Sequence, residues 1–516
     1  MGKRRSGIRN CIYWLSIFWV GSIAFLPLRA LAGDMEILID QMVNQGVITR
    51  EQGDKMLKGV EETKAKQQQK AVGEQEKAVG EQQKAAGEQE KKGAEQPKVE
   101  AKAPIPDWAK NLPDWILNPP DFIKRIRFMG DFRLRYDYLD REPTAAQEAK
   151  GTQDFARNRA RFRLRFGAET ELIDGLKVGF GIATVDPSGS STTNGNNPRS
   201  NMATFNSEFS KKFIGINYAY LAYTAPFLPW VTVSGGKLKD IPFYQANSYN
   251  IGSTFLWDQN LTPEGVAIVF NYPDLLNFNG VSLDVFMNNA FFVIDEFGAG
   301  SASPYMLGFQ PGINLKFMKD FNFKVAAAYY DFYNIKHQAA LGFQPTPGNM
   351  NTLILIGKST TPVYAFNYNA FVESAEFGYK TPFPSIMPYA GVFGEIYKNT
   401  DSHDGGWQGG VRLGYPSLYK FGDWQFSYAY RRLERDAWLD TFNELNFYQG
   451  QTNSKGHYIW AGVGVMKHVN ATISYYHANS ISVHSSVSTG HGITLATPPS
   501  PKQPEDRLLV ELNVIF

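Results

Sequence analysis

The chain has 516 residues, a formal net charge of +2 and one cysteine, and 14% of its residues are aromatic. A single cysteine excludes a disulfide framework, and the near balance of charges gives no basis for nucleic-acid binding. Mean hydropathy is −0.32, and no run of eighteen apolar residues follows residue 32, so a membrane role would require strands rather than helices.

Residues 1–32 have the pattern of a secretory signal peptide. Basic residues up to Arg9 precede an apolar run from Cys11 to Leu28, and Ala30-Leu31-Ala32 supplies a cleavage site after Ala32. A retained membrane anchor would not explain that small-residue triplet. Removal takes away Cys11 and five of the 52 basic residues, so the exported chain is expected to be cysteine-free, with 47 basic against 50 acidic residues.

Two further segments precede the main domain. Residues 33–66 predict a small helical hairpin, with Thr49-Arg50-Glu51-Gln52 as a capping box, which is either an ordered stub or a contact for peptidoglycan or for oligomerisation. Residues 67–120 contain a seven-residue repeat that begins at Lys70 and end in a Pro- and Trp-rich boundary. Each repeat carries a glycine, which costs about 1 kcal/mol in a helix, so a solvated spacer is favoured over a coiled coil.

The remaining residues, 121–516, alternate with a period of two. From Arg157 to Glu171, arginine and glutamate occupy most odd positions, and Phe162, Leu164 and Phe166 lie between them. A strand directs such sets to opposite faces. Sixteen such strands are expected, and the gaps between them alternate between long and short. This parity predicts an all-β fold, a transmembrane antiparallel barrel of about sixteen strands with long outer loops and periplasmic termini.

The last strand, from Arg507 to Phe516, alternates in the same way and ends on an aromatic residue. Barrel closure requires this strand to pair with the first one, which leaves no unpaired edge in the lipid. The terminal Phe516 resembles the signal that outer-membrane proteins present to the barrel-assembly machinery.

Three stretches carry a resemblance to a known family: Gly130 to Tyr136, Arg157 to Gly167, and Leu508 to Phe516. Together with the N-terminal organisation, they resemble the bacterial outer-membrane porins. The resemblance implies a sixteen-stranded pore in outer-membrane lipid, often a homotrimer.

Arginines of the first two strands would face the water-filled lumen that a barrel of this size encloses. The candidate selectivity residues are Arg133, Arg135, Arg159, Arg161, Arg163 and Arg165. Such a cluster would attract anions. Alternatively, these arginines only pair with acids on neighbouring strands, such as Asp131 or Asp137.

The third long loop, Lys239 to Pro263, is the candidate for a constriction, because the loop at that position narrows the pore in the porins that the chain resembles. Its candidate residues are Asp240, Tyr244, Trp257 and Asp258. An acidic, aromatic loop that faces a basic wall would create a transverse field.

Catalytic, metal-binding and cofactor motifs do not occur among the seven scattered histidines or elsewhere. Aromatics at strand ends, among them Trp407 and Trp460, are expected to form interfacial girdles. The sequence therefore predicts a passive diffusion channel for small hydrophilic solutes, with a preference for anions. The alternative is a tether in which residues 34–103 link the outer membrane to the cell wall.

Overall fold

A computed structural model describes residues 121–143, 155–185, 197–206, 208–246, 255–298, 302–339, 341, 351–481, 493–495 and 503–516. The signal peptide, helical hairpin and spacer predicted within residues 1–120 lie outside these ranges. Within them, no helix is both long enough and apolar enough to cross a membrane.

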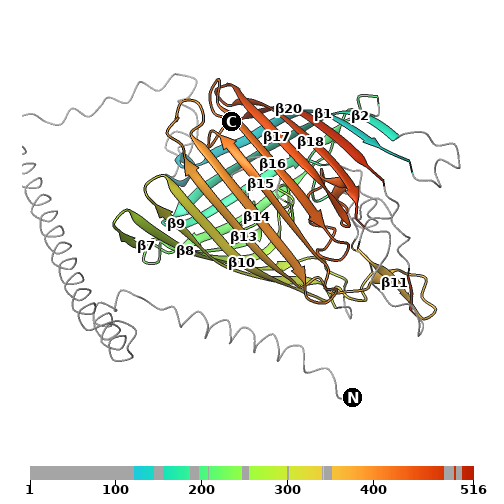
Figure 1. The fold of residues 1–516 in the computed structure, drawn as a ribbon. Coiled ribbons are helices and arrows are strands. Elements are labelled where there is room, and N and C mark those ends of the chain that lie inside the picture. The colour runs from blue at the N-terminus through green and yellow to red at the C-terminus, as the bar shows by residue number, and fades with distance from the viewer. Residues whose placement is uncertain are drawn as a thin grey trace, which may run out of the picture. The chain divides into compact units, whose positions relative to one another are not determined.

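Sixteen antiparallel strands form a closed barrel (Figure 1). They are β1 (Arg127–Arg141), β2 (Phe155–Ile173), β3 (Leu176–Thr184), β5 (Ile214–Thr224), β6 (Val231–Lys237), β7 (Glu264–Phe278), β8 (Val281–Val293), β9 (Tyr305–Phe317), β10 (Phe321–Tyr333), β13 (Ala370–Lys380), β14 (Tyr389–Asn399), β15 (Gly405–Gly414), β16 (Trp424–Leu433), β17 (Ser454–Met466), β18 (Val469–Ser480) and β20 (Glu505–Ile515). Each strand pairs with the next, and β20 pairs with β1. The predicted sixteen-stranded, all-β barrel is confirmed.

The minor elements lie before β1 or between the barrel strands. A four-residue helix, α5 (Asp121–Lys124), precedes β1, and β4 (Ala203–Thr204) pairs with β2. Three short strands form a separate sheet: β11 (Leu353–Ile356), β12 (Val363–Tyr364) and β19 (Ile493–Leu495). A 3-10 turn, η2 (Tyr448–Gly450), lies between β16 and β17.

The strand connections sort by length. The connections at the end where β1 finishes include 185–213, 238–263, 334–369, 434–453 and 481–504, whereas the other end carries turns such as 174–175, 279–280 and 318–320. We call these the long-loop end and the short-turn end. Such sorting is typical of outer-membrane barrels.

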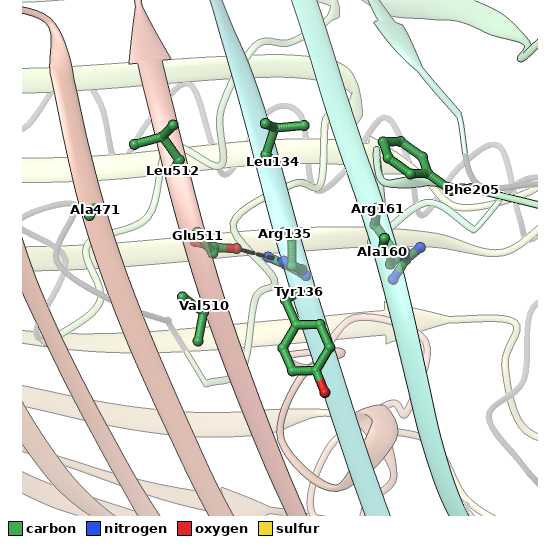
Figure 2. Close-up of a pocket in the computed structure, with 10 residues that line it drawn as sticks. All are labelled: Leu134, Arg135, Tyr136, Ala160, Arg161, Phe205, Ala471, Val510, Glu511 and Leu512. Atoms are coloured by element: carbon green, nitrogen blue, oxygen red, sulfur yellow. Dashed lines mark hydrogen bonds and ion pairs between the residues drawn. The ribbon is translucent and has the colours of Figure 1, made fainter.

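The two faces of the wall differ as the period of two predicts. On β2, Leu164 and Phe166 are 38% and 43% exposed, whereas Arg161 and Arg163 are almost fully buried. The apolar side therefore faces outward. An apolar groove of about 420 Å³ lies on this side of the seam where β20 meets β1, and Figure 2 shows Leu134 and Leu512 beside it, with the Arg135–Glu511 bond in the same view.

The predicted aromatic girdle is correct for Trp407, which is 43% exposed, but Trp460 is only 7% exposed. Trp460 lies two residues after the fully buried Tyr458 and therefore shares its inward face. Its assignment to a girdle was wrong, because proximity to a strand end does not decide which face a side chain occupies.

Candidate functional site: the lumen wall and the segments folded against it

The register of β1 and β2 places arginines directly opposite one another. Arg133 faces Arg163, and Arg135 faces Arg161. Like charges in such positions destabilise a sheet. The flanking pairs, Asp131 with Arg165 and Asp137 with Arg159, bring together opposite charges instead.

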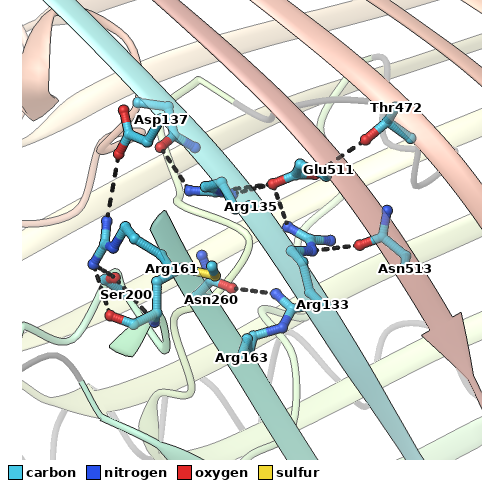
Figure 3. Close-up of polar contacts among 12 residues, drawn as sticks. Arg133, Arg135, Asp137, Arg161, Arg163, Ser200, Asn260, Thr472, Glu511 and Asn513 are labelled. Atoms are coloured by element: carbon cyan, nitrogen blue, oxygen red, sulfur yellow. Dashed lines mark hydrogen bonds and ion pairs between the residues drawn. The ribbon is translucent and has the colours of Figure 1, made fainter. Parts of the chain in front are cut away.

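Carboxylates on β20 and on β1 accept hydrogen bonds from these opposed arginines. Glu511 on β20 accepts from Arg135 Nε at 2.6 Å and from Arg133 Nη1 at 3.3 Å (Figure 3). Asp131 accepts from Arg163 Nε at 2.8 Å. The arginines therefore pair with acids, as the alternative interpretation expected, although Glu511 was not among the acids named from sequence.

Asp137 holds the part of the network nearer the long-loop end. Its side chain is fully buried and accepts from Arg159 Nη2 at 2.7 Å and Arg507 Nη2 at 2.9 Å. Bonds of this charge-assisted kind fix side chains firmly.

The network nevertheless contains more cations than anions. The ion pairs that arginines of β1, β2 and β20 make join Arg133, Arg135, Arg141, Arg159, Arg161, Arg163, Arg165 and Arg507 with Asp131, Asp137, Glu505 and Glu511. Eight guanidinium groups thus share four carboxylates, so pairing leaves a local excess of positive charge.

Exposure to the lumen changes along β2. The exposed fraction of the side chain is 2% for Arg161 and 5% for Arg163, but it is 35% for Arg165. Arg133 on the neighbouring strand is 16% exposed. Arg159, which lies nearer the long-loop end, is 15% exposed. Arg165 is therefore the arginine of this ion-paired network that water and dissolved ions reach most easily.

The described residues of the third loop, 239–246 and 255–263, lie against the inner wall. Tyr244 donates its backbone N–H to Gln310 Oε1 on β9 at 2.7 Å, and Ala246 donates to Glu395 Oε1 on β14 at 2.7 Å. Trp257 is 3% exposed and stacks near Phe243. Among the residues predicted for this loop, Tyr244, Trp257 and Asp258 are buried within the barrel, whereas Asp240 is exposed.

A second segment, residues 434–453 between β16 and β17, also folds inward. All of its residues except Glu434, Phe442, Leu445 and Gln449 are buried or nearly so. A connection on the surface would expose most of its backbone. Asp258 Oδ2 accepts from Leu445 N at 2.9 Å, and Asp258 N donates to Phe442 O at 2.8 Å, so the two infolded segments meet at Asp258.

Burial perturbs the acids of these segments. Desolvation raises the pKa of Asp436 and of Asp440 to about 6, although Thr352 and Asn351 donate hydrogen bonds to them. Burial also raises the pKa of Asp258, against the bonds from Leu445 and Asn260. Within the described ranges, no group of three or more acids, histidines or cysteines is arranged to bind a metal ion.

The family described as "Putative porin" matches residues 138–366 and 363–516. The chain belongs to this family. As a porin it is an outer-membrane channel protein, which agrees with the apolar outward face and the charged inner wall. No curated protein matches the chain.

Several solved porin structures resemble the barrel remotely. A triple mutant of Rhodopseudomonas blastica porin is 15% identical, with a TM-score of 0.38, over 76% of this chain and all of that one. Pseudomonas putida OprB at high pH is 9% identical with a TM-score of 0.43, over 78% and 97% of the chains. Salmonella typhi OmpF in complex with daunomycin is 12% identical with a TM-score of 0.41, over 76% and 97%.

Sequence reasoning missed two features of this porin's lumen. The first is segment 434–453, whose signal is compositional: Trp438, Leu439, Phe447 and Tyr448 make it too apolar for an exposed loop. The second is Arg199, which is 1% exposed in the connection between β3 and β5 and has no periodic pattern around it.

Proposed function

We propose that this porin is a passive diffusion channel for small hydrophilic solutes, that it prefers anions, and that its long-loop end faces outward from the cell. The single observation that supports the anion preference is the excess of arginine over carboxylate on β1, β2 and β20, with Arg165 and Arg133 accessible from the lumen. Positive walls raise the local concentration of anions and speed their entry.

The same proposal includes a contribution of the third loop to the constriction. It also includes a selectivity role for the six candidate arginines, which are Arg133, Arg135, Arg159, Arg161, Arg163 and Arg165. Assembly as a homotrimer, a peptidoglycan contact through the N-terminal region, and recognition of Phe516 by the barrel-assembly machinery belong to it as well. Phe516 supports the last point because it donates its N–H to Gly130 O at 3.0 Å at the closing seam and is 52% exposed as a residue.

Planar bilayers test the channel. Folded protein should give stepwise, ohmic conductance, and folded protein that stays silent would contradict the proposal. In a salt gradient, Arg165→Gln should move the reversal potential toward cations, because it removes the most exposed guanidinium group of the ion-paired network. The matched control is Arg432→Gln, since Arg432 faces outward on β16 and pairs with Glu434. An equal shift in both variants would remove the arginine wall from the mechanism.

A further inference from the structure

We infer that segment 434–453 forms a bar across the lumen and sets the size limit of the channel, with Arg199 as its positioning residue. The inference rests on the proposed channel function. It assigns the narrowing of the pore chiefly to this segment rather than to the third loop.

The segment contacts opposite sides of the barrel. At one end, Asn446 Oδ1 accepts from Arg135 on β1 at 3.4 Å, and its carbonyl accepts from Arg507 on β20 at 3.4 Å. At the other end, the Trp438 ring lies 5.3 Å from that of Tyr330 and 5.5 Å from that of Phe332, both on β10. β10 is the ninth strand in the ring of sixteen that starts with β1, so these contacts lie across the diameter.

The bar is packed along its length and not only at its ends. Trp438 has its ring centroid 5.1 Å from that of Trp257, and Phe447 lies 5.4 Å from Phe255 in an edge-to-face arrangement. Glu444 pairs with Arg431 on β16 and accepts from the Tyr476 hydroxyl on β18 at 2.9 Å. Aromatic contacts of this kind add to the stabilisation from burial.

Arg199 reaches the bar from a different loop. Its Nη1 group donates to the carbonyl oxygens of Asp440 at 2.8 Å, Asn443 at 3.1 Å and Gly450 at 3.2 Å. Its own carbonyl accepts from Asn260 Nδ2 at 3.1 Å, so one residue connects the bar with the third loop.

The backbone of the bar is shaped for this contact. Gly450 has a φ of +73°, and a Cβ atom there would lie 2.6 Å from Arg199 Nη1. The two preceding residues, Tyr448 and Gln449, also have positive φ angles, of 49° and 54°. Such conformations are unfavourable for residues other than glycine and persist only where the surroundings enforce them.

Asn351 provides a second, independent anchor. Its Nδ2 group donates to the carbonyl oxygens of Arg435 and Trp438, each at 2.8 Å, and its Oδ1 atom accepts from Asp440 N at 2.8 Å. Residues Arg435 to Asp440 of the bar are therefore held by the connection between β10 and β13, which contains Asn351.

The test compares single-channel conductance and the size of neutral sugars that enter liposomes carrying the protein. Arg199→Gln leaves carbonyls of the bar without donors, so conductance should rise several-fold and larger sugars should enter. Lys211→Gln is the matched control, because Lys211 is an exposed cation in the same connection. Folded Arg199→Gln with wild-type conductance and the wild-type sugar limit would overturn the inference.

If Arg199→Gln does not fold, Asn351→Ala decides the question by the same two measurements, and an unchanged channel in that variant overturns the inference. A silent wild-type protein would instead contradict the proposed channel itself. A conducting wild-type protein with unaffected variants would contradict only the role of the bar.

Discussion

The two segments that fold into the lumen differ in what holds them. The described part of the third loop near Tyr244 is hydrogen-bonded to residues of the barrel wall. The side-chain amide of Gln310 accepts from Tyr244 N and donates to Tyr244 O, each at 2.7 Å. The bar at residues 434–453 depends instead on other loops for much of its anchoring, through Arg199, Asn351 and Asp258. A constriction fixed to the wall is as rigid as the barrel, whereas one held partly by neighbouring loops can be loosened by a change outside the strands.

Loss of the Trp438 ring should have the largest effect, because it removes the aromatic contact between the bar and β10. Trp438→Ala should destabilise the closed position of the bar by about 3–5 kcal/mol, as expected for a large aromatic core residue. Limited proteolysis should then cut within residues 434–453 much faster than in the wild type. Trp407→Ala is the control, since Trp407 faces outward and is 43% exposed. Equal protection of the wild type and Trp438→Ala would contradict the proposed packing of the bar.

Low pH should stabilise the closed position of the bar. The pKa of Asp436 and of Asp440 is about 6 in the folded protein, above the usual value of 3.8, because of burial. A carboxyl with a raised folded pKa contributes stability that is fully present below about pH 4 and is lost as pH rises through 6. At about 1.4 kcal/mol per unit of pKa, each group contributes about 3 kcal/mol.

Conductance should therefore be lower at pH 5 than at pH 7.5. Asp440→Asn, which mimics the neutral form, should show a smaller difference between the two pH values. A larger conductance at pH 5 would reverse the sign and refute this account of the buried carboxyls.

The smallest effect is expected from the third loop. Gln310→Ala removes the amide that bonds Tyr244 from both sides, and each buried backbone group left unpaired costs about 1–3 kcal/mol. We expect faster proteolysis near Tyr244 but only a slight change in conductance, because the bar remains in place. A conductance change as large as that of Arg199→Gln would assign the size limit to the third loop instead.

Much of this molecule could be predicted from local patterns. The period of two on β2 predicts which side chains face outward from the barrel. The alternation of long and short connections predicts that the strands form a barrel. The inward position of Arg161 and Arg163 follows from the same alternation.

The rest could not be predicted because it depends on contacts between distant parts of the chain. Glu511 meets Arg135 across 376 residues, and Arg199 meets Gly450 across 251. No periodicity connects such partners. The apolar composition of residues 434–453 indicates burial, but it does not show which parts of the barrel the segment contacts. The opposed arginines likewise depend on the register of β1 and β2, which the two sequences alone do not fix.

The most direct test is to remove the bar altogether. Leu433 and Ser454 are register partners at the ends of β16 and β17, so Asn-Gly in place of residues 434–453 can close a two-residue hairpin without moving either strand. The barrel should fold, its single-channel conductance should rise several-fold, and larger sugars should pass. A folded barrel with the conductance and sugar limit of the wild type would show that residues 434–453 do not restrict the pore.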